Sequence, residues 1–358
     1  MELKDIVERV TRKNKDLETK RPLTISAQYG LIDQESFFNK TVASANLSNY
    51  YLLKKGEFAY NKSHSSDYPW GAIKRLDNYP LGALSTLYLC FKPDENIVSD
   101  YLVHYFESPR WHNQVSNIAG EGARNHGLLN IAVGDFFATK HFTPKIKAEQ
   151  IIIAEFLNLI TKRIEIQIRA IEKLESLMKG LLGYLFKTVK SNAHTFLLGD
   201  ICNITTGKLD ANAMVKDGEY AFFTCAEKPY RIDKYAFDTE ALLVSGNGNV
   251  GYINYYKGKF NAYQRTYVLS DFSHNISYIK YYLKAHLHAR IDQEKNIGNI
   301  PYIVLSTLAD MKIMIPHANI VDKIVRLLDS VEGKISRESN LLNHYINQKQ
   351  YLLQEMFI

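Results

Sequence analysis

Hydrophobic positions recur every three or four residues along two long stretches of the chain, and each stretch begins at a proline. The first runs from Pro144 to Phe186 and the second from Pro316 to Phe357. This spacing is typical of helices that pack along a coiled-coil seam. The predicted seam positions are Ile153, Leu157, Ile160, Ile164, Ile171, Leu174, Met178, Leu181, Ile324, Leu327, Val331, Ile335 and Leu342. Because each helix alone would expose an apolar stripe to water, we predict that the two helices pack against each other as an antiparallel coiled coil.

The segments before the two helices resemble each other in the order of their patterns. Tyr101–Phe106 is similar to Tyr278–Leu283, and Gly71-Ala72-Ile73 is similar to Gly251-Tyr252-Ile253. Similar blocks in the same order indicate an internal repeat. The apolar and aromatic runs predict strands at Glu57–Tyr60, Leu84–Phe91, Ala241–Ser245 and Thr266–Leu269, and helices at Val98–Glu107 and Ile276–Ala285.

The sequence therefore predicts an α+β chain of four parts. These are a first globular head at residues 1–143, a central helix at 144–190, a second head at 191–315 and a distal helix at 316–358. A helix of about forty residues spans roughly 60 Å. Two heads held at a fixed separation would suit a protein that reads two features at a set distance.

Composition narrows the class of protein without identifying it. The chain has 358 residues, 46% of them hydrophobic, and a formal net charge of +6. Its three cysteines, Cys90, Cys202 and Cys225, are far apart, so the sequence favours neither a disulfide framework nor a zinc site. The N-terminal residues form no apolar signal region, and no uncharged apolar run is long enough for a membrane span, so we expect a reduced cytoplasmic location.

One glycine-rich segment looks catalytic at first sight. Gly246–Gly251 fits the G-x-G-x-x-G pattern and follows the strand-like Ala241–Ser245. A dinucleotide site needs a helix directly after that pattern, whereas residues 252–258 are aromatic and end in glycine. We interpret the segment as a hairpin or exposed loop whose Asn247 and Asn249 can reach a ligand. We find no nucleophile elbow, paired carboxylate site or metal cluster in the sequence, so we expect no catalytic residues and no metal site.

Two local clusters of basic residues are mixed with aromatic ones. Residues 54–75 and residues 252–284 each contain five lysines and arginines and few acids. Such a cluster can form a phosphate-binding face. Alternating tyrosine and lysine equally fits half-buried strands with one solvated face.

Several ordered stretches resemble the specificity subunit of type I restriction-modification enzymes. They are Tyr60-Asn61-Lys62-Ser63 with Tyr68–Ala72, then Gly120–Arg124, the helix start from Pro144 to Gln150, and Leu198–Ile201 with Gly207-Lys208. The resemblance covers essentially the whole chain. One departure is the start of the distal helix, Pro316–Ile320, which lacks the Glu149-Gln150 pair of the central helix.

The resemblance implies a non-catalytic subunit with two target recognition domains separated by the two helices. Each domain would read one half of an asymmetric, gapped DNA target, and the helices would act as a spacer. Methyltransferase subunits would pack on the heads and helices, and a restriction subunit with translocase activity would complete the complex. S-adenosylmethionine, ATP and magnesium would then belong to those partners, and we expect no cofactor on this chain.

Protein side chains read duplex DNA through amide, guanidinium, hydroxyl and imidazole groups at base edges, and through lysine and arginine at phosphates. On this basis we predict that the DNA-binding residues are Asn61, Lys62, Ser63, His64, Arg75, Arg124, Asn125, His126, Asn247, Asn249, Lys257, Lys259 and Arg265. For Asn247 and Asn249, an alternative role is to satisfy the backbone of their own turn.

Two further functions stay open from the sequence. The chain could be a coiled-coil scaffold whose tyrosine-rich heads bind protein or glycan. It could also be an enzyme that uses the glycine loop after Ser245. Neither explains the repeated plan of head and helix as directly as DNA specificity does.

Overall fold

The computed structural model describes residues 1–26, 29–40, 43–44, 46–65, 68–120, 127–189, 193–294 and 302–357. The chain divides into two compact units, and both boundaries between them fall inside long helices. Unit 1 comprises Met1–Ile168 and Leu341–Ile358, and unit 2 comprises Arg169–Asn340. Each unit contains one head and one half of each long helix.

The head of unit 1 is built mainly from short strands. Its strands are β1 (Val7–Arg9), β2 (Leu23–Ser26), β3 (Gly30–Asp33), β4 (Tyr51–Lys54), β5 (Phe58–Asn61), β6 (Ala72–Arg75), β7 (Leu81–Leu84) and β8 (Leu89–Pro93). Its helices are α1 (Gln34–Phe38), α2 (Ser99–Tyr105), α3 (His112–Ile118) and α4 (Val133–Phe137). Four strands form one sheet in the order β1-β8-β5-β6, while β2 pairs with β3 and β4 pairs with β7.

Alternation along β5 explains why the sheet of unit 1 is buried on both faces. Phe58 and Tyr60 point into one core, where they stack on Phe91 and Phe136 respectively. Ala59 between them belongs to a second core, on the opposite side of the sheet. Successive side chains of a strand point to opposite faces, so one short strand contributes to both cores.

The head of unit 2 has one larger sheet. Its strands are β9 (Ala193–Leu197), β10 (Asn203–Thr206), β11 (Tyr220–Phe223), β12 (Tyr230–Ile232), β13 (Phe237–Ser245), β14 (Ile253–Ala262), β15 (Thr266–Ser270) and β16 (Lys312–Pro316). Its helices are α6 (Leu198–Ile201), α7 (Ile276–Glu294) and α8 (Leu305–Ala309). Six strands pair in the order β10-β15-β13-β14-β11-β12, and β16 pairs with β9.

The glycine-rich segment connects two antiparallel strands, as the sequence predicts. β13 and β14 pair from Phe237↔Phe260 to Val244↔Ile253, and the segment forms the loop between them. No helix follows the loop, so the dinucleotide motif lacks its structural context. Gly207, after β10, lies against the end of β14. A Cβ atom at Gly207 would lie 1.8 Å from the carbonyl oxygen of Ala262, which requires glycine there.

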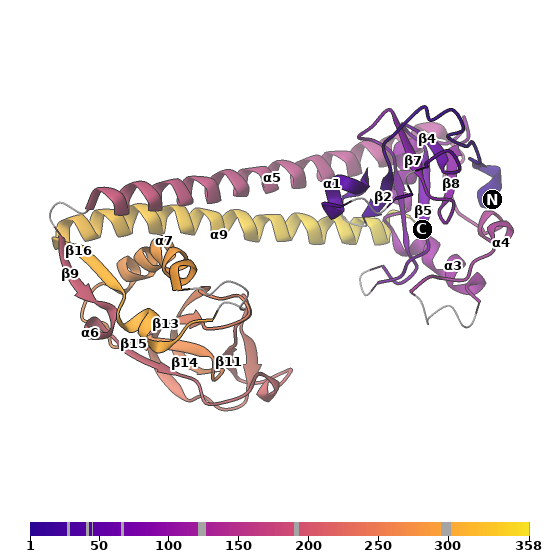
Figure 1. The fold of residues 1–358 in the computed structure, drawn as a ribbon. Coiled ribbons are helices and arrows are strands. Elements are labelled where there is room, and N and C mark those ends of the chain that lie inside the picture. The colour runs from indigo at the N-terminus through magenta and orange to yellow at the C-terminus, as the bar shows by residue number, and fades with distance from the viewer. Residues whose placement is uncertain are drawn as a thin grey trace. The chain divides into compact units, whose positions relative to one another are not determined.

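The two long helices are α5 (Lys147–Thr188, 42 residues) and α9 (Ala318–Glu355, 38 residues). In unit 1, Leu157 of α5 shares a buried core with Leu353 near the end of α9. In unit 2, Phe186 near the end of α5 shares a core with Ile324 near the start of α9. Within each unit the two helices therefore run antiparallel, side by side (Figure 1).

The internal repeat is visible as one aromatic contact made twice. In unit 1, the ring of Phe357 packs 5.4 Å from Tyr101 and 5.7 Å from Tyr105, both on α2. In unit 2, the ring of Phe186 packs 5.5 Å from Tyr278 and 5.3 Å from Tyr282 of α7. Each head thus packs against a phenylalanine within two residues of the C-terminal end of a long helix.

Burial along the long helices repeats with an offset of 171 residues. Gln150, Leu157 and Asn158 of α5 occupy the positions of Val321, Leu328 and Asp329 of α9, and Leu157 and Leu328 are both fully buried. The same offset relates Phe186 to Phe357. This register lets each position of one unit be compared with its counterpart in the other.

Two details of the predicted elements are wrong. Leu327 is 43% exposed, and its neighbour Leu328 is fully buried instead, because Leu328 follows Ile324 by four residues on the same helix face. The predicted strand Leu84–Phe91 is two strands, β7 and β8, separated by a turn in which the backbone N–H of Tyr88 donates to the Ser85 carbonyl at 3.2 Å.

Candidate nucleic-acid interface and docking groove

Three of the predicted DNA-binding residues of unit 2 lie together at the loop between β13 and β14. The Gly246 N–H donates to the Arg265 carbonyl at 2.8 Å, which holds the loop beside the turn before β15. Asn249 and Arg265 are exposed and Asn247 is half-buried. Asn247, Asn249 and Arg265 are therefore brought to one edge of the head.

The loop closes through main-chain hydrogen bonds. Gly251 donates to the Ser245 carbonyl at 2.8 Å and Tyr252 donates to the Asn249 carbonyl at 3.1 Å. Within the described part of the chain, the side-chain amides of Asn247 and Asn249 have no hydrogen-bond partner. Both amides are therefore available to an external ligand, and they are not needed to satisfy the turn.

Lys257 and Lys259 lie apart from this loop along β14. Lys257 pairs with Glu240 of β13. Lys257 lies four residues beyond Ile253, where β14 begins, and four residues of extended strand span about 13 Å. Its ammonium lies 3.9 Å from the Glu240 carboxylate, and the Lys259 ammonium lies 4.7 Å from the ring centroid of Tyr235. The two lysines form a second exposed group on the same head.

The remaining lysines of the basic cluster at 252–284 are used inside unit 2. Lys280 and Lys284 of α7 bind the two carboxylate oxygens of Glu332 on α9 at 2.6 and 2.7 Å. Tyr281 donates to Asp329 at 2.7 Å and to Glu332 at 2.9 Å. Burial opposes ionisation of Glu332, but the two ammonium groups outweigh it and lower its pKa to about 2. These lysines fasten the head to α9.

In unit 1 the predicted residues at 61–64 form the edge of a small loop pair. The Leu129 N–H donates to the Lys62 carbonyl at 2.9 Å, and the His64 N–H donates to the Gly127 carbonyl at 3.0 Å. Ser63 and His64 are exposed and Lys62 is half-buried. The Asn61 side chain accepts the Ser63 N–H at 3.0 Å, so it serves its own turn. Arg124, Asn125 and His126 lie outside the described residues.

Arg75 is placed differently from the other predicted DNA-binding residues. Its guanidinium contacts Asp77 and Asp100, both at 2.6 Å, and Ser99 at 2.9 Å. Its side chain is largely buried. The geometry of Arg75 is that of a residue that joins β6 to α2.

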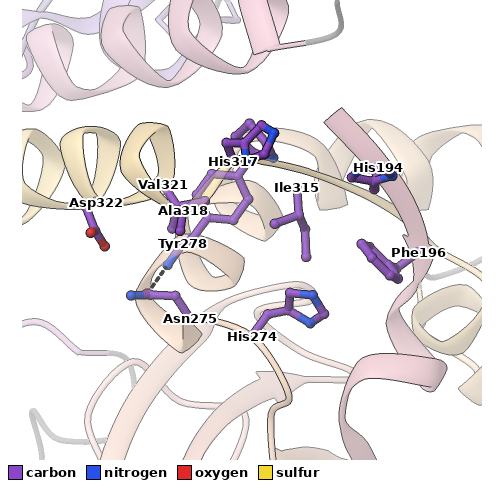
Figure 2. A pocket seen from close by; sticks show the side chains of 11 residues that line it. His194, Phe196, His274, Asn275, Tyr278, Ile315, His317, Ala318, Val321 and Asp322 are labelled. Carbon is purple, nitrogen blue, oxygen red and sulfur yellow. Dashed lines mark hydrogen bonds between the residues drawn. The ribbon is translucent and has the colours of Figure 1, made fainter. Parts of the chain in front are cut away.

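The start of each long helix is built differently in the two units. In unit 1 the amide of Gln150 is 1% exposed, accepts the Val98 N–H at 2.8 Å and donates to the Pro144 carbonyl at 2.9 Å. In unit 2 the equivalent residue is Val321, which lines an open cavity of about 350 Å³ (Figure 2). The distal helix lacks the Glu-Gln pair of the central helix, so Val321 at the wall of a cavity takes the place of the buried amide of Gln150.

The cavity at the start of α9 is lined by three imidazoles and by apolar groups. Figure 2 shows His194, His274 and His317 around it, with Tyr278 and Ile315 between His317 and His274. Among the described residues, no group of three or more histidines, cysteines and acids is arranged to hold a metal ion. The cavity therefore offers no metal centre within the described ranges.

A groove lies on the surface of the helix pair in unit 1. It has a volume of about 820 Å³ and is lined from α5 by Phe156, Leu159, Ile160, Lys162, Arg163, Ile166 and Gln167 and from α9 by Leu341, Tyr345 and Gln348. The guanidinium of Arg163 lies 4.7 Å from the ring centroid of Tyr345. The groove was not predicted from the sequence, although Phe156, Leu159 and Ile166 follow helical spacing, because the inner seam accounts for most apolar residues.

Buried contacts fix each head on its own half of the helix pair. His104 of α2 lies 2.9 Å from the Asn158 side-chain oxygen, and Tyr281 and Asp329 are the equivalent pair in unit 2. Burial lowers the pKa of His104. Glu107, two residues after the end of α2, receives Lys349 of α9 at 2.8 Å. Because these residues are buried or paired within the protein, they are not among the exposed DNA-binding groups predicted from the sequence.

Comparison with known proteins finds similarity to the family that the sequence resembles. Residues 190–344 match the family of the type I restriction modification DNA specificity domain. The EcoDI specificity subunit of a type I restriction enzyme from Escherichia coli is 40% identical over 147 residues, which are 40% of this chain and 33% of that protein. A putative type I specificity subunit from Mycoplasma pneumoniae is 27% identical over 172 residues, which are 43% of this chain and 63% of that protein. The matched regions span a third to under two thirds of these relatives.

Solved structures extend the likeness of fold to the whole chain. The crystal structure of a type I restriction-modification S subunit from M. genitalium has a TM-score of 0.63 at 15% identity, and covers 100% of this chain and 95% of that one. A structure described as showing complex assembly and conformational transition of the type I restriction-modification system has a TM-score of 0.57 at 16% identity, with coverage of 99% and 95%. The predicted resemblance is confirmed, and so is the fold of two mixed heads with two long helices. No helix among the described residues is long and apolar enough to cross a membrane.

Proposed function

We propose that the chain is the DNA-specificity subunit of a type I restriction-modification complex. The observation that carries this proposal is the shared fold, which covers the chain from end to end and includes a match to the specificity domain in residues 190–344. The subunit itself is non-catalytic. S-adenosylmethionine, ATP and magnesium belong to partner subunits.

The loop group of unit 2 carries the chemistry for reading bases. A primary amide can bind adenine through two hydrogen bonds in the major groove, and a guanidinium can bind guanine in the same way. Asn247 and Asn249 have free amides, and Arg265 forms no salt bridge with described residues. Lys257 and Lys259 contact phosphates and set the register.

In unit 1, Lys62, Ser63 and His64 take the equivalent role. The main chain of this group is hydrogen-bonded to Gly127 and Leu129. The two heads differ in sheet size and in the residues they expose. The DNA target is therefore two unlike half-sites.

The long helices set the length of the gap and bind the methyltransferase subunits. The groove of unit 1 supports the second role, because exposed apolar side chains that line a concave surface favour a protein partner. A restriction subunit with translocase activity joins the same assembly.

The test is methylation sequencing of cells that carry this chain and its methyltransferase partner. Wild type gives one bipartite motif. Asn249→Ala or Arg265→Ala relaxes or abolishes one half-site and leaves the other half-site and the gap unchanged. Lys259→Ala is the matched control, since loss of a phosphate contact weakens methylation without changing the motif.

Three outcomes would count against the proposal. An unchanged motif in both loop variants would remove these residues from base recognition. A wild-type chain that adds no motif beside an active methyltransferase would favour the scaffold. DNA binding that is insensitive to salt would also favour the scaffold, because phosphate contacts make affinity fall steeply with salt.

An insertion tests the spacer role separately. Four residues added within α5 change the gap length or prevent helix pairing, and they leave the bases of both half-sites as they were. A change in base preference would contradict the spacer role.

A further inference from the structure

The outer face of α5 in unit 1 carries a second hydrophobic seam besides the one buried against α9. Its positions are spaced by four, three, four and three residues, and they are Ile152, Phe156, Leu159, Arg163 and Ile166. The four apolar members are between 43% and 68% exposed. A seam with this heptad spacing fits another helix, since knobs of the partner pack into the holes between such positions.

The equivalent face of α9 in unit 2 is of a different chemical kind. With the offset of 171 residues, the five seam positions correspond to Lys323, Leu327, Ser330, Lys334 and Arg337. Three of these five side chains are cationic and one is a small hydroxyl. Only Leu327 keeps the apolar character, and it is 43% exposed.

The two faces therefore bind a helix with different forces. On the first face, the apolar side chains of a partner helix are removed from water, and the gain scales with the apolar area covered. On the second face, the same partner leaves lysine and arginine at the seam, where burial of unpaired charge is costly. Binding there relies on acidic groups of the partner, and salt screens that attraction.

We infer that this chain has two unequal docking sites for a methyltransferase helix, a tight apolar one on α5 in unit 1 and a weak cationic one on α9 in unit 2. The inference rests on the proposed function, which supplies the partner. The chain fills its first site before its second, so a complex with one methyltransferase subunit accumulates before a complex with two.

The test is a titration of the full chain with its purified methyltransferase subunit, followed by native mass spectrometry and calorimetry. Wild type binds in two steps that differ at least about tenfold in affinity, as each 1.4 kcal/mol of difference is tenfold. A rise in salt from 50 to 500 mM weakens the second step by about tenfold and leaves the first within about threefold.

Two triple variants exchange the character of the faces. Ile152→Lys with Leu159→Ser and Ile166→Arg gives the first face the residues of the second, and it removes the tight step. Lys323→Ile with Ser330→Leu and Arg337→Ile does the reverse, and it gives two tight steps of similar affinity. All six positions are exposed, and circular dichroism checks that the helices persist.

Each result decides a separate point. Two equal steps in wild type, or a first-face variant that keeps its tight step, overturns the unequal sites but leaves the proposed function standing. A wild-type chain that binds no methyltransferase subunit at all overturns the proposed function, and with it this inference.

Discussion

His141 makes the stability of unit 1 sensitive to mild acid. Its imidazole is 2% exposed and lies between two hydroxyls, with Tyr105 2.8 Å from Nδ1 and Thr139 2.7 Å from Nε2. Burial, followed by the nearby N-terminal ammonium of Met1, lowers the pKa of His141 to about 4. The folded unit therefore resists protonation at a pH where the unfolded chain accepts a proton.

The sign and size of the effect follow from this difference. Above pH 6.5 both states hold a neutral imidazole, and the stabilisation is complete. As the pH falls from 6.5 towards 4, only the unfolded state gains a proton, so the free energy of unfolding decreases. The difference between 6.5 and about 4 corresponds to about 3 kcal/mol in total, and to about 2 kcal/mol between pH 7 and pH 4.5.

Substitution of His141 by glutamine removes the titrating group. We expect His141→Gln to be less stable than wild type at pH 7, because its hydrogen bonds are poorer. Its free energy of unfolding should fall by about 2 kcal/mol less than that of wild type between pH 7 and pH 4.5.

Tryptophan fluorescence during urea unfolding is the appropriate assay. The two tryptophans of the chain, Trp70 and Trp111, both lie in unit 1, so the signal reports on that unit alone. His344→Gln is the control, since His344 is an exposed histidine of the same unit. Equal pH dependence in wild type and His141→Gln would refute the reasoning.

Three further predictions concern the long helices. Gln150→Leu removes two hydrogen bonds of a buried amide and should lower the stability of unit 1 by about 2 kcal/mol in the same fluorescence assay. Leu328→Ala should cost about 3 kcal/mol and Leu327→Ala less than about 1 kcal/mol in thermal melts, and equal costs would contradict the observed register. Glu332→Gln should cost about 1 kcal/mol at pH 7, a figure reduced for its exposed fraction of 36%, and the cost should shrink as the pH falls from 4.5 towards 2 because the carboxylate then protonates. Hydrogen exchange of α7 at pH 7, and thermal melts at lower pH, would check this last prediction.

Features that depend on local patterns could be predicted from the sequence. The apolar spacing predicted the first and last residues of α5 and α9 to within three residues. The aromatic run after residue 252 correctly indicated that no helix follows the glycine-rich loop. The repeat of Tyr101 and Tyr278 was also visible as a pattern. These are properties of neighbouring residues along the chain.

Features that depend on distant partners could not be predicted. Lys280 and Arg75 look like phosphate-binding residues in the sequence, but each is paired with a carboxylate from another element. Whether Leu327 or Leu328 is buried depends on the rotation of α9 about its own axis relative to its neighbours. Heptad spacing fixes that rotation only to within one residue. No pattern distinguishes a lysine that meets DNA from one that meets a glutamate 52 positions away.

The packing of Phe357 against Tyr101 and Tyr105 has a consequence for biosynthesis. Unit 2 is continuous in sequence, whereas unit 1 draws residues from both sides of it. On the ribosome, the strands of the first head emerge early, but the core of that head lacks Leu353 and Phe357 until the last turns of α9 are made. The domain that is synthesised first is therefore completed last. Until then its tyrosines remain uncovered, and a nascent chain that stalls within α9 would present them to chaperones and proteases.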